Sequence, residues 1–318
     1  MESVIKRKRH LKKWNLNDFE LLIMALTGLA FLIVFAYFPM YGVILAFKQG
    51  DGVLNIAQAI FGSPWAEKGG FGNFIELFQD TKFWAVFRNT VTLNVITIVI
   101  GFPAPIIFAL LVNEIRNKRF KKFVQTFSVV PHFISWTVFG GIILNIVDPS
   151  SGIINTTLSF FGFSGRLNLV AEENIWGVII VSELLKSVGW GSIVYIAAIT
   201  RINPEIYEAA TVDGANRFQK MVYVTVPGIS ATIITFLILR ISRLLGNSFE
   251  EFFVFQKQIN INRTQVLATY IYSEGIGSTT SRRYSYTAAM GLVNSFIGMV
   301  LLLISNFISK KLTDKGLF

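Results

Sequence analysis

Residues 205–227 read EIYEAATVDGANRFQKMVYVTVP, a stretch of mixed polarity between two long apolar runs. A helix is predicted to begin just before it, because Asn203 is a suitable N-cap and Pro204 suits the first helical position. That helix should end near Gly214, after which ANRFQKMVYV is again compatible with a helix and a proline closes the stretch. The stretch therefore predicts two short helices that meet at an angle.

The rest of the chain is strongly apolar. Of its 318 residues, 53% are hydrophobic and 15% are charged, and the mean hydropathy is +0.55, which is more apolar than a soluble domain. The apolar residues cluster in six runs, each long enough for a helix to cross a hydrocarbon core of about 30 Å. Since lipid offers no hydrogen-bond partners to the backbone, helices are expected. The sequence thus predicts an all-α membrane protein with six transmembrane helices over residues 20–47, 89–112, 124–147, 174–200, 228–246 and 287–309.

The basic residues indicate which side of the membrane each connection occupies. More than half of the 29 Lys and Arg residues lie in four segments at alternate ends of the predicted spans, residues 6–13, 114–122, 201–220 and 310–315. The positive-inside rule assigns these segments, and with them both termini, to the cytoplasm. The N-terminal cluster is better explained by lipid headgroups than by nucleic acid, because it directly precedes an apolar run.

A single membrane domain is predicted, with a basic N-terminal segment (1–19), a six-span region (20–309) and a cytoplasmic tail (310–318). The first run lacks the short apolar core and small-residue cleavage site of a signal peptide, so it is expected to remain in the mature protein. Kinks are expected at helix breakers inside the spans. These breakers are Pro39, Pro103, Pro105, Pro131, Gly189 and Gly191.

Residue patterns typical of enzymes are nearly missing. The chain has no cysteine and two histidines, His10 and His132, neither of which has a carboxylate at helical spacing. It contains neither a G-x-S-x-G motif nor a phosphate-binding loop of the G-x-x-x-x-G-K-[ST] type. If the protein performs work, the energy must come from elsewhere.

Charged residues inside predicted spans are costly and mark functional candidates. Glu183 and Lys186 stand three residues apart, so they are predicted to form either a self-neutralising pair or part of a pathway. Arg240 and Arg243 are also three residues apart, and they are expected to face a wet cavity, to pair with acids later in the same helix or to extend toward the outer interface. The candidate substrate-pathway residues are Glu183, Lys186, Trp190, Arg240, Arg243, Asn247 and Glu250, and no metal site is predicted.

The stretch at 203–227 resembles the EAA loop of membrane subunits of binding-protein-dependent ABC importers. That pattern is E-A-A, three residues, G, nine residues and I-x-L-P, and here it runs from Glu208 through Gly214 to Pro227, with valines for Ile and Leu. DGA at 213–215, GNSFEEFFVF, YSYTAAMGLVNS and the C-terminal KKLTDKGLF resemble the carbohydrate-uptake branch and its polysaccharide-permease subfamily. The resemblance covers most of the chain.

This resemblance implies a type I importer permease fold with a cytoplasmic coupling helix. The coupling residues carried over by motif are Glu208, Ala209, Ala210, Asp213 and Gly214. The chain would be a non-catalytic translocation subunit in a prokaryotic cell membrane, binding no cofactor itself, with ATP and Mg on a separate ATPase. Implied partners are a second homologous permease, two ATPase copies, an extracytoplasmic solute-binding protein and an oligosaccharide, besides membrane lipid.

Two alternative functions remain open at this point, as does the chemical class of the substrate. The chain is alternatively an ion-coupled secondary transporter that uses Glu183 as its coupling site, or a scaffold without a pathway. Four arginines would favour acidic oligosaccharides through charge-assisted hydrogen bonds. They are Arg240, Arg243, Arg282 and Arg283.

Overall fold

The computed structural model describes residues 16–53, 55–163, 165–246, 249–277 and 282–313. Within these ranges the chain consists of helices and turns, with one isolated antiparallel bridge between Lys48 and Trp65. Most of the predicted N-terminal segment 1–19 and more than half of the tail 310–318 lie outside them. The prediction of an all-α protein is confirmed.

The N-terminal part runs from α1 to α6. Its elements are α1 (Leu16–Leu32), η1 (Ile33–Tyr37), α2 (Phe38–Met40), η2 (Tyr41–Phe47), α3 (Ile56–Gly62), η3 (Lys68–Gly70), α4 (Gly72–Gln79), α5 (Thr81–Ile96), η4 (Thr97–Gly101) and α6 (Pro103–Asn113). The central part contains α7 (Lys118–Phe133), α8 (Trp136–Ile146), α9 (Ile153–Phe160), α10 (Ile175–Ile199), α11 (Pro204–Val212), α12 (Arg217–Lys220), η5 (Met221–Thr225), α13 (Val226–Gly228) and α14 (Ser230–Ser242). The C-terminal part contains α15 (Phe249–Phe255), α16 (Ile261–Thr264), α17 (Leu267–Tyr272), η6 (Ser273–Gly277) and α18 (Tyr284–Thr313).

Four helical segments are long and apolar enough to cross a membrane, and two bent pairs bring the number to six if each pair is one span. The four are Asp18–Phe47, Thr81–Asn113, Ile175–Ile199 and Tyr284–Lys311. They correspond to the first, second, fourth and sixth predicted spans. The two bent pairs correspond to the third and fifth predicted spans.

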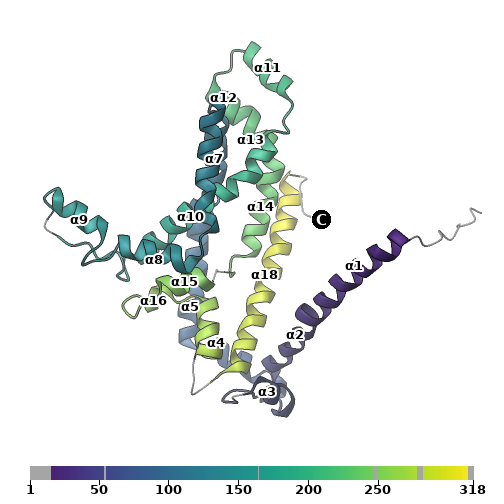
Figure 1. The fold of residues 1–318 in the computed structure, drawn as a ribbon. Coiled ribbons are helices and arrows are strands. Elements are labelled where there is room, and N and C mark those ends of the chain that lie inside the picture. The colour runs from purple at the N-terminus through teal and green to yellow at the C-terminus, as the bar shows by residue number, and fades with distance from the viewer. Residues whose placement is uncertain (1–15, 54, 164, 247–248, 278–281, 314–318) are drawn as a thin grey trace, which may run out of the picture.

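The third predicted span, 124–147, is not a straight crossing. The chain bends by 101° between α7 and α8, because Ile134 and Ser135 leave the helical conformation and Ser135 caps α8 through its hydroxyl. After this bend α8 and α9 extend sideways from the main bundle (Figure 1). Hydropathy does not reveal the bend, since both arms are apolar.

The fifth span begins and ends earlier than predicted. Its helical run starts in α12, bends by 63° at Ile229 and ends with α14 at Ser242, four residues before the predicted end at Gly246. Gly246 instead closes a turn, with its N–H donating to the carbonyl of Arg243 at 2.8 Å. Residues 243–246 are apolar enough to extend the hydropathy run, but their backbone is not helical.

Three π-helical turns explain how prolines fit within the spans. η1, η4 and η5 end two residues before Pro39, Pro103 and Pro227 respectively. A proline removes one backbone donor and its ring clashes with the carbonyl one turn earlier, and a wider turn accommodates both changes. The predicted irregularities at Pro39 and Pro103 are therefore confirmed, whereas Pro227 lies inside a helical run rather than opening one.

The glycines of α10 have a different role from the one predicted. The helix is continuous from Ile175 to Ile199, so Gly189 and Gly191 do not kink it. A Cβ atom on Gly189 would lie 2.0 Å from the backbone oxygen of Ser128 in α7, and one on Gly191 would lie 3.1 Å from Cγ of Pro105 in α6. The two glycines permit close packing of helices, as small residues do in membrane bundles.

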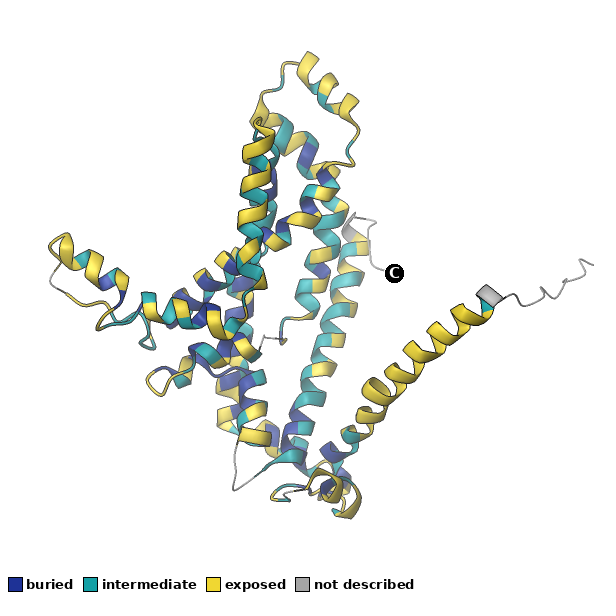
Figure 2. Cartoon of the chain, viewed as in Figure 1, coloured by how far each residue is buried: buried dark blue, intermediate teal, exposed yellow. Residues whose placement is uncertain are grey.

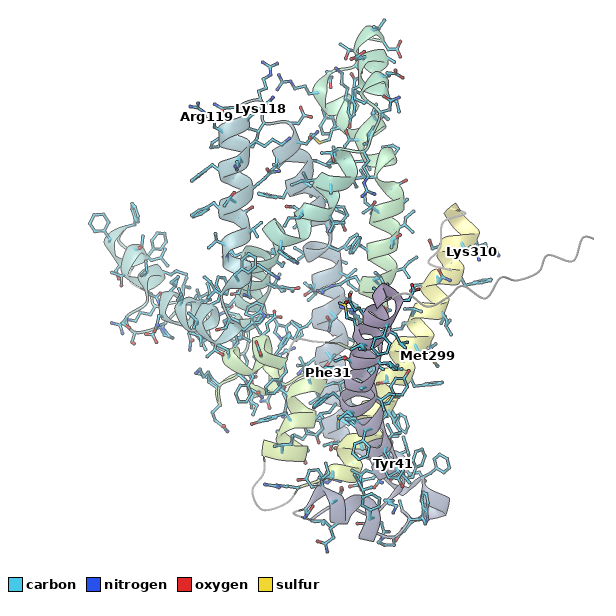
Figure 3. The ribbon with its side chains drawn as sticks, turned by 45° about the vertical axis from the view of Figure 1, so that its right-hand side comes forward. Phe31, Tyr41, Lys118, Arg119, Met299 and Lys310 are labelled. Carbon is cyan, nitrogen blue, oxygen red and sulfur yellow. The ribbon has the colours of Figure 1, made fainter. Side chains whose placement is uncertain are left out.

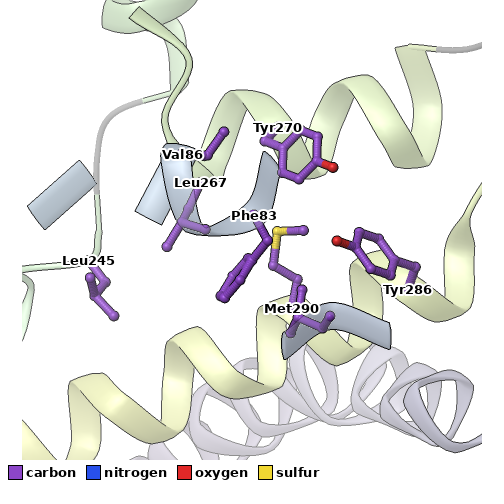
Figure 4. Close-up of a cluster of buried hydrophobic side chains, with 8 residues drawn as sticks. Phe83, Val86, Leu245, Leu267, Tyr270, Tyr286 and Met290 are labelled. Atoms are coloured by element: carbon purple, nitrogen blue, oxygen red, sulfur yellow. The ribbon is translucent and has the colours of Figure 1, made fainter. Parts of the chain in front are cut away.

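A buried cluster joins α4, α5, α17 and α18 at the end of the molecule opposite α11 (Figures 1 and 4). Tyr270 and Tyr286 belong to it, and both hydroxyls donate to Oδ2 of Asp80, at 3.1 and 2.5 Å. By contrast, α1 stands apart from the bundle, and every residue from Phe19 to Tyr41 is exposed (Figure 2).

Candidate functional site

The stretch at 203–227 forms a helical hairpin at one end of the molecule, around α11 and α12 (Figure 1). Asn203 caps α11, its side-chain oxygen accepting from the N–H of Glu205 at 3.1 Å. Gly214 adopts a φ of +78°, which L residues avoid, and so allows the bend. Asn216 and Gln219 then form a capping box at the start of α12. The predicted cap, bend and second helix are confirmed.

Most of the surface of this hairpin is exposed. α11 buries no residue, and Glu208, Ala209, Asp213 and Gly214 are exposed, while Ala210 is half-buried. A hollow of about 250 Å³ lies between the two helices and is lined in part by Ala210, Asp213 and Gly214. The five predicted coupling residues thus lie together on one accessible element.

The hairpin is attached to the spans by specific contacts. The hydroxyl of Tyr207 in α11 lies 2.9 Å from that of Thr225 in η5, and within the hairpin Lys220 donates to the hydroxyl of Thr211 at 2.7 Å. Beneath them, a buried cluster that includes Tyr195, Ile199 and Ile229 joins α6, α10 and the start of α14. Met221 and Val226, which follow α12, pack against this cluster, so the hairpin is connected to α6, α10 and α14.

The basic connections share the hairpin's end of the molecule. Lys118 and Arg119, at the start of α7, lie at this end, and Lys310 of α18 lies in the same half, whereas Tyr41 lies toward the opposite end (Figure 3). Of the segments that the positive-inside rule groups together, those that contain Lys118, Arg119 and Lys310 thus lie in the hairpin's half of the molecule, whereas residues 6–13 are outside the described ranges. Their assignment to the cytoplasm stays a prediction.

Glu183 does not pair with Lys186. Its carboxylate accepts from Arg240 at 2.9 Å, which links α10 to α14. The alternative of a self-neutralising pair three residues apart was therefore wrong, because a partner from another helix competes with the local one. Residue spacing within one helix cannot predict a partner that comes from another helix.

Lys186 instead caps the broken end of α7. Its ammonium donates to the carbonyls of Pro131 and His132, both at 3.1 Å, and of Ile134. It also lies 5.2 Å from the ring centre of Trp136, at the start of α8. Because a helix C-terminus carries partial negative charge and unpaired carbonyls, a buried cation stabilises the 101° bend.

Replacing Lys186 by methionine should lower the stability of the protein by about 1–3 kcal/mol, the usual cost of leaving buried polar groups unpaired. The measurement is thermal unfolding of the purified protein in detergent. Lys82→Met is the control, since the Lys82 side chain is 55% exposed and, among the described residues, its ammonium contacts only side chains, Glu274 at 3.5 Å and the Tyr270 ring centre at 4.9 Å. Equal losses in the two variants would contradict a capping role for Lys186.

Four of the seven predicted pathway residues line one cavity of about 420 Å³ between α6, α10 and α14. They are Glu183, Trp190, Arg240 and Arg243. Lys186 is buried beside the α7 break instead, Glu250 is exposed on α15, and Asn247 lies outside the described residues. Since α14 ends at Ser242, Glu250 does not continue the helix of the arginines, and that predicted pairing within one helix was wrong.

Three side chains near this region have surroundings that the sequence did not predict, although His132 and the acids at 250 and 251 were noted as polar residues. The ring of His132 stacks on Trp190, with centroids 4.5 Å apart and planes 3° from parallel. Glu251 is 6% exposed in α15. Asn294, on α18, has a buried side-chain oxygen. Only their polarity within or beside apolar segments could have indicated them.

The other two arginines that were linked to an acidic substrate lie at the end opposite the hairpin. Arg283 forms ion pairs with Asp51, Glu76 and Glu274, and Arg282 donates to the hydroxyl of Tyr284 at 3.1 Å. Burial raises the pKa of the Asp51 carboxyl, an effect that backbone hydrogen bonds and the charge of Arg283 oppose. This network ties α4 and η6 to the start of α18.

The comparisons with known proteins agree with this architecture. The family model described as "binding-protein-dependent transport system inner membrane component" matches residues 101–314. The chain is 36% identical to protein LplB of Bacillus subtilis (strain 168) over 304 residues, which are 95% of this chain and 92% of LplB. It is 34% identical to the polygalacturonan/rhamnogalacturonan transport system permease protein YteP of the same strain over 313 residues, or 98% of this chain and 94% of YteP.

Two solved structures are similar throughout their length. One is a bacterial ABC transporter involved in the import of the acidic polysaccharide alginate, with a TM-score of 0.83, 35% identity and coverage of 93% of this chain and 97% of that chain. The other is a bacterial alginate ABC transporter in complex with alginate pentasaccharide-bound periplasmic protein, with a TM-score of 0.82, 33% identity and coverage of 95% and 97%. The resemblance inferred from the EAA spacing is confirmed, and the chain belongs to the family of binding-protein-dependent transport system inner membrane components.

Proposed function

We propose that this chain is one permease subunit of an ATP-driven importer of acidic oligosaccharides. The observation that carries the proposal is the exposed hairpin at residues 203–227, with its EAA spacing, on a fold that matches ABC importer permeases over nearly the whole chain. The chain contains no phosphate-binding loop of its own. A separate ATPase, in two copies, would supply the energy.

The coupling residues would act at the contact with that ATPase. Ala209 and Ala210 have small side chains that let a partner approach closely, Glu208 offers a carboxylate to a basic group, and Gly214 sets the bend. ATP binding would favour the outward-open state and hydrolysis the return, because the hairpin is anchored to α6, α10 and α14. We place this end, and both termini, in the cytoplasm and the chain in the plasma membrane.

The remaining partners follow from the same assembly. A second homologous permease would complete the pathway, and an extracytoplasmic solute-binding protein would deliver the substrate. The similar alginate transporter forms a complex with an alginate pentasaccharide-bound periplasmic protein, which supports this partner. The acidic class of substrate is supported by the names of the similar proteins, which refer to alginate and to polygalacturonan/rhamnogalacturonan. It also fits an arginine-containing cavity between the spans.

The ion-coupled alternative is not favoured. It required Glu183 to serve as a proton or cation site, but the carboxylate is held by Arg240 at 2.9 Å. The carboxylate is thus already engaged by a cation from another helix of this chain.

The proposal is tested by purifying the chain with its partners and reconstituting the complex in proteoliposomes. ATP is supplied on the side of the membrane that carries the ATPase, and the solute-binding protein and sugar on the opposite side. Acidic oligosaccharides should then stimulate ATP hydrolysis and accumulate on the ATPase side. A parallel preparation contains the permease chain alone under an ion gradient. Gradient-driven uptake by that chain, without any ATPase, would overturn the proposal.

A further inference from the structure

The fifth span ends near the middle of the membrane. α14 packs beside α18 (Figure 1), and the carbonyl of Ser242, its last residue, would lie 3.2 Å from a Cβ atom on Gly298. Gly298 is midway along α18, a helix of 30 residues and thus about 45 Å in length. Because α18 is long enough to cross the whole membrane, the end of α14 lies at about half its depth.

Irregular backbone at this depth needs a special environment. Residues 243–246 form turns rather than a helix, and non-helical backbone inside the hydrocarbon region is tolerated where it is buried in protein or lines a wet cavity. Transporters place substrate sites near the bilayer midplane at such helix breaks. The position of this break therefore points to the substrate route.

A cavity of about 400 Å³ lies at the break, between the end of α14 and the middle of α18. Its polar lining residues are Ser242, Arg243, Asn294 and Ser295. Among the described residues, the side-chain oxygen of Asn294 is a buried acceptor without a hydrogen-bond partner. An unpaired buried acceptor is unfavourable, and a ligand hydroxyl would satisfy it.

The same cavity contains an unneutralised cation. Of the four arginines considered above, Arg240 is paired with Glu183, Arg283 with three acids, and Arg282 with Tyr284. Within the part of the chain that the structure describes, the guanidinium of Arg243 has no ion pair or side-chain hydrogen bond, and the residue is exposed.

Arg243 also stands where two cavities meet. It lines both the cavity at the break and the one between α6, α10 and α14. A sugar chain that passes from one cavity to the other must therefore pass this guanidinium. Arginine suits the role because its planar fork binds carboxylates through two hydrogen bonds.

We propose that Arg243 and Asn294 form a binding site for one uronate residue of the substrate, with the sugar carboxylate on the Arg243 guanidinium and a sugar hydroxyl donating to Oδ1 of Asn294. Arg240 is a positioning residue, because Glu183 already holds its guanidinium. The inference rests on the proposed import function and adds the residues that distinguish acidic from neutral sugars.

The test compares two substrates of the same shape in the reconstituted complex. They are an oligogalacturonate and its methyl ester, in which the carboxylates are neutral. The quantity compared is the ratio of acid uptake to ester uptake. The solute-binding protein is the same for wild type and variant, so a difference in this ratio between them must come from the permease. Arg243→Gln should lower uptake of the acid about tenfold more than uptake of the ester, the usual size of a charge-assisted contact.

Three further variants separate the roles. Arg243→Lys should retain most of the preference for the acid, because it keeps the charge. Asn294→Leu should raise KM for both substrates about tenfold, since both carry the hydroxyls. Arg240→Gln should lower the uptake of acid and ester equally. Thermal unfolding of each purified variant shows whether it is folded.

Two outcomes would overturn the inference, and they differ from failure of the proposed function. If the wild-type complex imports the acid but Arg243→Gln reduces acid and ester equally, Arg243 is a structural or lipid-contacting residue. If only Arg240→Gln shifts the ratio, the carboxylate is bound at the Glu183–Arg240 pair. Absence of ATP-dependent uptake of either sugar by the wild-type complex would instead overturn the proposed function itself.

Discussion

Replacing Gly214 by proline should reduce oligosaccharide uptake at least about 100-fold while the protein still reaches the membrane. Gly214 has a φ of +78°, and its N–H donates to the carbonyl of Thr211 at 3.1 Å. Proline fixes φ near −65° and has no N–H, so the bend between α11 and α12 cannot form. The measurements are uptake and substrate-stimulated ATP hydrolysis by the reconstituted complex, and we expect hydrolysis to continue without stimulation.

Gly162→Pro is a matched control for this prediction. Gly162 has a φ of +86°, its N–H donates to the carbonyl of Ser159 at 3.0 Å, and a Cβ atom there would meet nothing within 4 Å, as at Gly214. It follows α9, at a distance from the hairpin (Figure 1). This variant should retain most uptake. Similar losses at both glycines would indicate a general folding defect and contradict a coupling role for Gly214.

The second large effect is expected from Gly189→Ala, which should lower the stability of the protein by about 2–3 kcal/mol. The added methyl group would lie 2.0 Å from a backbone oxygen of α7, and that atom cannot move aside as the end of a flexible side chain does. α7 and α10 must therefore separate, which disturbs the contact that positions Lys186 at the α7 break. Thermal unfolding in detergent measures the change.

Gly177→Ala provides the comparison within the same helix. A Cβ atom at Gly177 meets nothing within 4 Å, and alanine favours the helix by about 1 kcal/mol over glycine. This variant should be as stable as the wild type or slightly more stable. An equally mild effect of Gly189→Ala would show that the two helices are not as close as the structure places them.

The features that could be predicted from the sequence are those that depend on neighbouring residues. Hydropathy over about 20 residues is sufficient to identify α10 and α18, since lipid imposes the helix and its minimum length. The cap at Asn203 and the bend at Gly214 could also be predicted. The cap follows from the hydrogen-bonding side chain of Asn203, and the bend from the lack of a side chain at Gly214.

What could not be predicted depends on contacts between distant segments. Glu183 and Arg240 are 57 residues apart, so helical spacing favoured Lys186 as the partner instead. The bend between α7 and α8 occurs within a continuous apolar run, and the cation that stabilises it comes from α10. The end of α14 at Ser242 was likewise hidden, because Leu244 and Leu245 continue the apolar pattern after the helix has stopped.

The exposed first helix has a consequence for biosynthesis. No residue from Phe19 to Tyr41 is buried by the rest of the chain, so within this chain the stability of the helix in a bilayer depends mainly on lipid transfer and its own hydrogen bonds. In the two-stage view of membrane protein folding, insertion precedes packing. We therefore expect this segment to complete the first stage without packing contacts from the later spans of the chain.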